Sequence, residues 1–353
     1  MKSDRALYLP RWGIFFSLKY KGEIKMKPFK EYEDQIKILR SRKLIINNEE
    51  KAIKILKNLN YYNIVNGYKR PFLKKDLNGD LSDPEEFIDG CTFEELISLY
   101  YLDKELKSEL FSYLLEFERK LKSYTAYLFS EKYKEEKFPY LNINNYSREK
   151  EDLTKVLSIV KTISNELKNK KAESVAHYIN NYNDLPLWVL INQLTLGNVS
   201  YFYDAIDITL REKIAKNFSL NYKKDYNSKE SITSEILINI IKIVIFFRNI
   251  CAHDNILLLF KMKSKTKTSE IKKVLTLKNG EDKIKNNIDY RGENLYDLLC
   301  VLKLVLDKEN FKLLIVKIKD ILSKYEKKFS VTTLENIIAL GGIKKNYLEE
   351  LLK

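Results

Sequence analysis

The chain has 353 residues, of which 44% are hydrophobic, so it is long enough to bury one large core or two modest ones. Ten glycines and six prolines are few for this length, which disfavours a sheet-rich fold with many tight turns and favours long helices joined by short polar loops. Lys and Arg outnumber Asp and Glu by 63 to 49, and the net charge of +14 favours a polyanionic partner such as RNA, DNA or an anionic membrane. The base composition of the genome is a second explanation of so many lysines.

Cysteine usage and hydropathy predict a reduced, cytoplasmic protein. The three cysteines are odd in number and form no C-x-x-C pair that could bind zinc or act as a redox couple. Residues 1–20 lack the continuous apolar segment and cleavage site of a signal peptide. The most apolar stretch, Ile236 to Phe247, is interrupted by Asn239 and Lys242 and is shorter than the ~20 residues of a membrane span. We expect this stretch to be a buried helix, and we expect no membrane partner.

A small N-terminal helical module is predicted before residue 90. One helix is expected where apolar residues recur from Tyr32. A second is expected to begin at Glu49, whose carboxylate suits the positive end of the helix dipole, with Asn47 or Asn48 as its N-cap. A dense cluster of turn-forming residues between Asp76 and Asp89 marks the end of this module.

The middle of the chain is predicted to consist of core helices. One or two long helices are expected from the N-cap Thr92 to about Tyr133, because apolar residues recur there every three or four positions. Another amphipathic helix is expected over Arg148–Asn169. The segments expected next are a loop near Asn180–Pro186, a core helix at Trp188–Leu196, a turn at Gly197-Asn198 and a helix at Ser200–Ile206.

The last third combines the most hydrophobic helical region, Ser231–Leu259, with a lysine-rich segment. Lys261–Lys278 holds seven lysines against one glutamate, and Val274, Thr276 and the turn pair Asn279-Gly280 predict a short basic hairpin or flap. A further helix is expected over Glu293–Leu306. The chain is therefore divided into an N-terminal extension (1–27), a helical module (28–90), a helical core (91–310) and a C-terminal helical tail (311–353).

An arginine and a histidine five positions apart lie at the end of the most hydrophobic region. Arg248 and His253 form the pattern R-N-x-x-x-H. Histidine has a reference pKa of about 6.5 and can transfer a proton near neutral pH, whereas arginine stays charged and can brace a phosphorane with paired hydrogen bonds. RNA supplies its own nucleophile, the 2′-OH. The pair therefore predicts phosphodiester cleavage that needs neither a metal nor another cofactor.

The spacing of this motif sets a structural condition. On a straight helix, positions five apart diverge by roughly 140°. Arg248 and His253 can then converge on one phosphate only through a local helix distortion or by meeting the same motif from a second copy, and we favour the second copy. A structural alternative is that Arg248 pairs with a neighbouring acid while His253 caps or packs a helix end. The other histidine, His177, is expected to anchor a helix end, and two histidines without a carboxylate at ligand spacing predict no metal site.

Several segments together resemble the abortive-infection proteins of the AbiD/AbiF type, which belong to the HEPN superfamily. Roughly residues 25 to 310 carry the likeness. It rests on Lys27-Pro28-Phe29, Leu59-Asn60-Tyr61-Tyr62, Gly67-Tyr68, Pro71-Phe72, Leu185-Pro186-Leu187-Trp188-Val189-Leu190, Leu196-Gly197 and the R-x4-H helix from Phe246 to His253.

The resemblance implies a HEPN-type helical bundle that forms a homodimer with facing R-x4-H motifs. It implies a metal-independent endoribonuclease of an abortive-infection or toxin–antitoxin system. By position, Arg248 and His253 take catalytic roles and Asn249 a polar supporting role. Family members can occur with a structured small RNA, so RNA is expected as substrate and as a bound partner. No role is assigned to Lys122, where family members often carry arginine.

Two further interpretations compete with the nuclease. The chain could be an RNA-binding scaffold, or an RNA-neutralised toxin that holds a structured small RNA without cutting it. A membrane-acting effector is disfavoured, because the sequence has neither a span nor a basic amphipathic terminal helix. The lysine-rich segment is either a solvated loop or an RNA contact, and the lysines predicted to touch RNA are Lys261, Lys263, Lys265, Lys267, Lys272 and Lys273.

Overall fold

The computed structural model describes residues 28–76, 78–169, 173–253, 255–262, 268–275 and 289–352. Over these ranges the chain is mainly helical, and β-structure is limited to isolated bridges such as the one between Ile45 and Thr92. The prediction of a mainly α fold is confirmed. The predicted extension, residues 1–27, lies outside the described residues.

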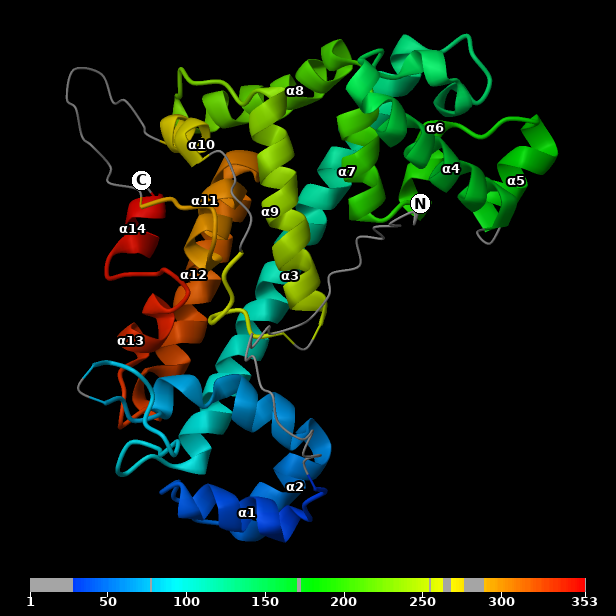
Figure 1. Cartoon of the computed structure of the whole chain (residues 1–353). Coiled ribbons are helices and arrows are strands. Elements are labelled where there is room, and N and C mark those ends of the chain that lie inside the picture. The colour runs from blue at the N-terminus through cyan, green and yellow to red at the C-terminus, as the bar shows by residue number, and fades with distance from the viewer. Residues whose placement is uncertain are drawn as a thin grey trace.

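The N-terminal end contains the two short helices that the sequence predicts, α1 (Tyr32–Ser41) and α2 (Glu49–Leu59). Asn48 is the N-cap of α2, because its side-chain oxygen accepts a hydrogen bond from the backbone N–H of Lys51 at 2.8 Å. The two helices pack on each other and lie at one end of the molecule (Figure 1). A π-helical turn, Tyr62–Asn66, then leads toward the core.

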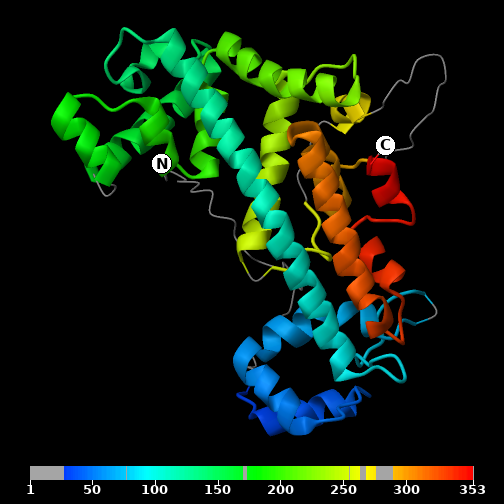
Figure 2. The same ribbon diagram turned by 180° about the vertical axis from the view of Figure 1, so that it is seen from behind.

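A single 40-residue helix, α3 (Phe93–Lys132), forms the axis of the molecule. It begins with a capping box, in which the Thr92 hydroxyl accepts the N–H of Glu95 and the Glu95 carboxylate accepts the N–H of Thr92. At 1.5 Å per residue it is about 60 Å long. Views from both sides show it running from the N-terminal helices to the opposite end of the molecule (Figures 1 and 2).

Between residues 133 and 226 the structure has two helices that were not predicted, at 173–182 and 208–226, and two of the predicted features differ. α4 (Leu153–Asn169) begins later than predicted, after a 3-10 turn. The predicted turn at Gly197-Asn198 is wrong, since the Thr195 hydroxyl accepts the N–H of Asn198 and starts a helix there. This region also contains α5 (Glu173–Tyr182), α6 (Leu187–Leu190), α7 (Leu196–Ala205) and α8 (Ile208–Tyr226).

The predicted hydrophobic helix is α9 (Ser234–Ala252), and the helices that follow it complete the core. The hairpin prediction is wrong for residues 268–275, which form α10 (Thr268–Leu275) with Ile271, Val274 and Leu275 buried on one face. The turn pair Asn279-Gly280 lies outside the described residues. The remaining helices are α11 (Leu295–Val305), α12 (Lys308–Tyr325), α13 (Leu334–Ala339) and α14 (Tyr347–Leu352). The division into domains stays a prediction.

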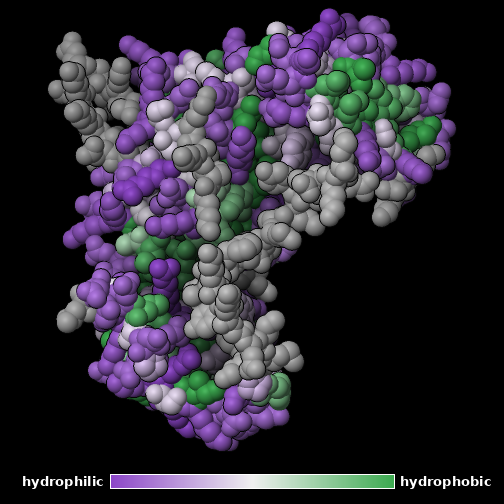
Figure 3. All heavy atoms as spheres, viewed as in Figure 1, coloured by the Kyte–Doolittle hydropathy of each residue, from purple (hydrophilic) through white to green (hydrophobic). Residues whose placement is uncertain are grey.

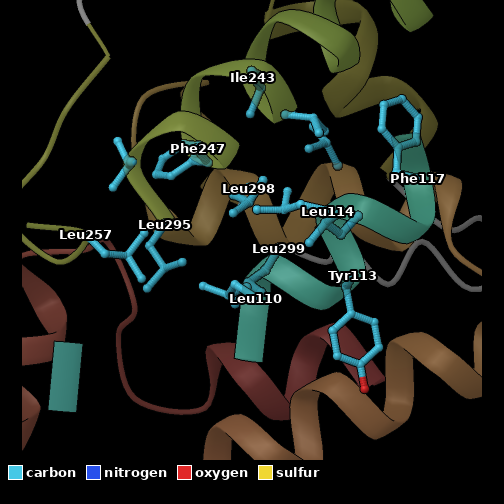
Figure 4. Close-up of a cluster of buried hydrophobic side chains, with 14 of the residues drawn as sticks. Leu110, Tyr113, Leu114, Phe117, Ile243, Phe247, Leu257, Leu295, Leu298 and Leu299 are labelled. Carbon is cyan, nitrogen blue, oxygen red and sulfur yellow. The ribbon is translucent and has the colours of Figure 1, made fainter. Parts of the chain in front are cut away.

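The hydrophobic core lies where α3, α9 and α11 meet. Figure 4 shows Phe117 of α3, Phe247 of α9 and Leu298 of α11 in one buried cluster, and each is at most 1% exposed. Consecutive residues of a helix point about 100° apart, so a buried Phe247 turns the neighbouring Arg248 away from this cluster. No helix in the described part of the chain is long and apolar enough to cross a membrane.

The visible surface is mostly hydrophilic, and hydrophobic residues gather on it over the α4–α6 end of the molecule (Figure 3). Leu153 and Leu157 of α4 and Trp188 of α6 are each about half exposed there. The core-helix prediction for Trp188–Leu196 is therefore correct for Leu190 and Ile191, which are buried, but not for Trp188 itself.

Candidate functional site

The candidate motif spans the C-terminal end of α9. Arg248 and Asn249 lie in the helix and are half-buried, whereas the helix ends at Ala252. His253 is the C-cap residue, with extended backbone angles of φ −123° and ψ 173°, and it is exposed. The helix therefore ends before His253, and the 140° divergence expected of a straight helix does not apply to this side chain.

Arg248 faces a buried carboxylate on α3. Its Nε lies 3.9 Å from Oε2 of Glu118, a residue that is only 7% exposed. The other carboxylate oxygen of Glu118 lies 2.8 Å from Nζ of Lys122, one helical turn further along α3. Glu118 therefore lies between two cations, and through it Arg248 of α9 contacts α3.

The guanidinium of Arg248 retains free hydrogen-bonding capacity. Its contact with Glu118 is longer than a hydrogen bond, and its only recorded donation within the described residues is from Nη1 to Oδ1 of Asn249 at 3.4 Å. Nε of Arg248 and Oε2 of Glu118 are both buried without a hydrogen-bond partner in the described chain. The buried Nε is not accessible to a ligand, whereas Nη2 makes no hydrogen bond within the described chain and is not buried, so its N–H groups can bind an anionic ligand.

Arg248 and His253 are not joined within one chain. No hydrogen bond or ion pair links them in the described part of the molecule. The pairing of Arg248 with Glu118 and the C-cap position of His253 both agree with a purely structural role, in which the arginine pairs with an acid and the histidine caps a helix. That interpretation leaves unexplained why the buried Nε of Arg248 has no hydrogen-bond partner in the described chain.

A second buried carboxylate, Asp103 of α3, holds the segment that follows His253. Its two oxygens accept the backbone N–H groups of Leu257 and Leu258 at 3.3 and 3.0 Å. The hydroxyl of Tyr68 donates to the same carboxylate at 3.1 Å. Desolvation raises the pKa of Asp103, and the nearby Lys107 ammonium and these donors oppose that rise. The chain leaving α9 is therefore fastened to α3.

Two further contacts tie the same segment in place. Nζ of Lys107 donates to the backbone oxygen of Asn255 at 3.0 Å. A Cβ at Gly67 would lie 3.1 Å from Cδ1 of Ile256, so a glycine at this position allows the N-terminal module to approach the segment closely. Together these contacts hold Asn255 to Leu258, a segment that begins two residues after His253.

Of the predicted lysines that the structure describes, those on α10 lie away from the motif. Lys261 is exposed in the segment after His253, but Lys263, Lys265 and Lys267 lie outside the described residues. Lys272 and Lys273 are on α10, and Nζ of Lys273 lies 3.7 Å from Oε2 of Glu230, which precedes α9. The 19 residues of α9 span about 28 Å. Lys273 is therefore near the opposite end of α9 from His253.

The other histidine lies on a different helix from the motif. His177, on α5, shares a hydrogen bond of 2.9 Å with Asn181 and contacts Tyr178 and Tyr182. In the described ranges, no cluster of three or more His, Cys, Asp or Glu side chains could hold a metal ion.

Glu118 and Asp103 are the site residues that the sequence analysis missed. Each occupies an apolar position of α3, since Asp103 follows Leu99 by four residues and Glu118 follows Leu114 by four. A carboxylate inside an apolar stripe predicts a buried, partnered acid. That signal was present in the sequence.

These features define a helical protein in which the largely buried helix α9 presents an R-x4-H motif at its C-terminal end. The model of the Abi-like protein family matches residues 54–258, which is more than half of the chain and includes α3, the motif and the segment held by Asp103. The chain belongs to the Abi-like protein family. Comparisons with curated proteins and with solved structures gave no match.

Proposed function

We propose that this protein is a metal-independent endoribonuclease of the HEPN type, acting in the cytoplasm in abortive infection or a toxin–antitoxin system. The family name supports the link to abortive infection. The observation that supports the enzymatic proposal is the half-buried guanidinium of Arg248, whose Nη2 makes no hydrogen bond in the described chain, five residues before an exposed imidazole at the end of α9.

In the proposed reaction, the 2′-OH of a ribose attacks the adjacent phosphorus and the bond to the 5′-oxygen of the next nucleotide breaks. His253 takes the proton of the 2′-OH or gives one to the leaving 5′-oxygen, and water serves as the partner in the other proton transfer, so that one proton is removed and one is supplied. Arg248 stabilises the charge on the pentacoordinate phosphate through its free N–H groups, and Asn249 orients the guanidinium through its 3.4 Å hydrogen bond. The products are a 2′,3′-cyclic phosphate and a 5′-OH, and no cofactor takes part.

We further propose that the site is completed by a second copy of the chain. In one chain Arg248 faces Glu118, while the exposed His253 has no bond to Arg248. Two-fold symmetry would let the two motifs face each other, so that Arg248 of one copy and His253 of the other act on one phosphate.

The test is cleavage of total RNA in EDTA by the wild type, His253→Ala, Arg248→Ala and a His177→Ala control. His253→Ala is expected to lower the rate by about 100- to 10,000-fold, the usual contribution of general acid–base catalysis. His177→Ala makes the same change outside the motif and should retain wild-type activity. Loss of all cutting in EDTA for the wild type would contradict the proposal. Retained RNA affinity without cutting would favour the RNA-binding scaffold or RNA-neutralised toxin.

A further inference from the structure

A groove between α3 and α6 lies beside the candidate site. Its volume is about 390 Å³, within the range of about 300 to 1,000 Å³ that is common for ligand pockets. α6 packs against the end of α3 that is remote from the N-terminal helices (Figures 1 and 2). The lining residues used below are Arg119, Lys122, Ala126 and Tyr127 of α3, with Trp188 of α6 and Asn192.

The cations of this groove connect it to the motif. Lys122 lines the groove, and its ammonium binds the same Glu118 carboxylate that faces Arg248. One carboxylate therefore separates the groove from the candidate catalytic arginine. Arg119, one turn before Lys122, is exposed and has no hydrogen bond or ion pair to any described residue. A polyanion that reaches Arg248 would meet both of these cations next.

Two large aromatic side chains are left in solvent at the groove. Trp188 is 54% exposed and Tyr127 is 67% exposed, although burial of either ring would be favourable. The buried Ala126 also lines the groove. Asn192 donates its side-chain N–H to the backbone oxygen of Trp188 at 2.9 Å, which fixes the turn that carries the indole. Aromatic faces beside cations are the combination that binds unpaired nucleobases.

We propose that this groove binds one unpaired nucleotide of RNA next to the scissile phosphate, with its base stacked on Trp188 or Tyr127 and its phosphate on Arg119 and Lys122. This inference rests on the proposed function for the identity of the RNA as substrate. The stacking itself can be measured without any cleavage.

The binding test uses the full chain with Trp12→Phe and His253→Ala. Trp188 is then the sole tryptophan, since the sequence has two, and cutting is prevented. The probes are a single-stranded adenosine RNA octamer, an octamer of abasic ribose phosphates and a blunt RNA duplex. The adenosine octamer is expected to quench Trp188 fluorescence on binding, and the other two are expected to leave it unchanged. Quenching by the abasic octamer or the duplex to the same extent would overturn the proposal.

A variant series separates stacking from folding. Trp188→Ala is expected to weaken octamer binding by about 10- to 100-fold, and Trp188→Phe should restore most of it because phenylalanine still stacks. Arg119→Ala should weaken binding. It should also reduce the slope of the logarithm of the binding constant against the logarithm of salt concentration by about one. The control is Tyr201→Ala, which removes an equally exposed aromatic residue of α7 outside the groove, and it should bind like the parent.

The outcomes distinguish this inference from the proposed function. Suppose that the wild type does not cut RNA, but the octamer quenches Trp188 fluorescence and Trp188→Ala weakens binding. Nucleotide binding in the groove is then supported, and the nuclease proposal is refuted. If the wild type cuts RNA but Trp188→Ala and Tyr201→Ala bind the octamer equally, the nuclease stands and the groove is refuted.

Discussion

At the scale of single residues, Glu118 is the group on which the candidate site depends. It is almost fully buried and its two oxygens face Arg248 and Lys122, so its charge compensates two cations that would otherwise repel each other. Because Arg248 does not hydrogen-bond to it, Glu118 can hold the guanidinium in place without occupying all its donors. It acts as a positioning residue.

Glu118→Gln should test this role with little change of shape. Loss of the carboxylate charge is expected to lower the free energy of unfolding by about 2 kcal/mol, because Glu118 loses its ion contacts with Lys122 and Arg248. The loss is not larger because water can still solvate both partly exposed cations. Urea denaturation measures this, and RNA cleavage should fall in parallel. Glu131→Gln, the same change at an exposed position of α3, should stay within about 0.5 kcal/mol of the wild type. Equal stability of the two variants would contradict the role of Glu118.

The buried Lys303 of α11 is expected to make the stability of the fold depend on pH, independently of the candidate site. It is 2% exposed, with Nζ 4.9 Å from the ring centre of Tyr226, and burial lowers its pKa from 10.5 to about 8. Between pH 8 and 10.5 the unfolded chain binds more protons at this residue than the folded chain does, so this residue favours folding increasingly as the pH rises.

Lys303→Met should therefore raise the free energy of unfolding at pH 7 by up to about 3 kcal/mol, and its advantage should shrink as the pH approaches 10. Thermal or urea denaturation at pH 7, 8.5 and 9.5 measures the difference. Lys216→Met, at an exposed position of α8, is the control. A difference between Lys303→Met and the wild type that does not vary with pH would contradict this account.

At the scale of elements, the junction between α9 and the segment after it sets the geometry of the motif. Asp103 binds two backbone N–H groups of that segment and the hydroxyl of Tyr68, while α9 ends at Ala252. The segment that begins two residues after His253 is therefore held by a carboxylate located in a different helix.

Asp103→Ala should lower the free energy of unfolding by about 3 kcal/mol, because two buried N–H groups and the Tyr68 hydroxyl lose the carboxylate that accepts their hydrogen bonds. It should also increase amide hydrogen exchange at Leu257 and Leu258, which mass spectrometry of the segment can measure. Asp34→Ala, at a partly exposed position of α1, is expected to change neither quantity. Unchanged exchange in Asp103→Ala would show that other contacts fix the segment.

The elements differ in how far the sequence predicted them. Caps and apolar spacing located α2, α3 and α9, because Asn48, Thr92 and the buried face of α9 act locally. The turn at Gly197-Asn198 was wrong because the Thr195 cap outweighed the turn propensity of that pair. α8 was not predicted, although its buried residues Leu210, Ile214, Phe218 and Tyr222 recur every four positions.

The site was predicted only in part for a physical reason. The motif residues Arg248 and His253 are only five positions apart in the sequence, so the motif was recognisable from the sequence alone. Glu118 and Asp103 reach them from α3, and such long-range contacts depend on how the helices pack. The lysines of α10 were expected beside the motif from chain proximity, but α9 places Lys273 near its other end.

At the scale of the whole molecule, the proposed dimer predicts complementation between two inactive variants. If each site takes Arg248 from one copy and His253 from the other, a mixture of Arg248→Ala and His253→Ala should regain roughly a quarter of wild-type activity. If the subunits exchange at random, half of the dimers contain one copy of each variant, and one of the two sites in each such dimer is intact. Cleavage assays after co-refolding, with light scattering to confirm a dimer, measure this. No recovery in a mixed dimer would place both residues of a site in one chain.

The chemical identity of the RNA ends tests the central claim most directly. Mass spectrometry of a defined RNA cut in EDTA should find a 2′,3′-cyclic phosphate, or the phosphate formed by its hydrolysis, on one fragment and a 5′-OH on the other, with neither appearing for His253→Ala. A 3′-OH and a 5′-phosphate at the cut would contradict attack by the 2′-OH, and with it the roles proposed for Arg248 and His253.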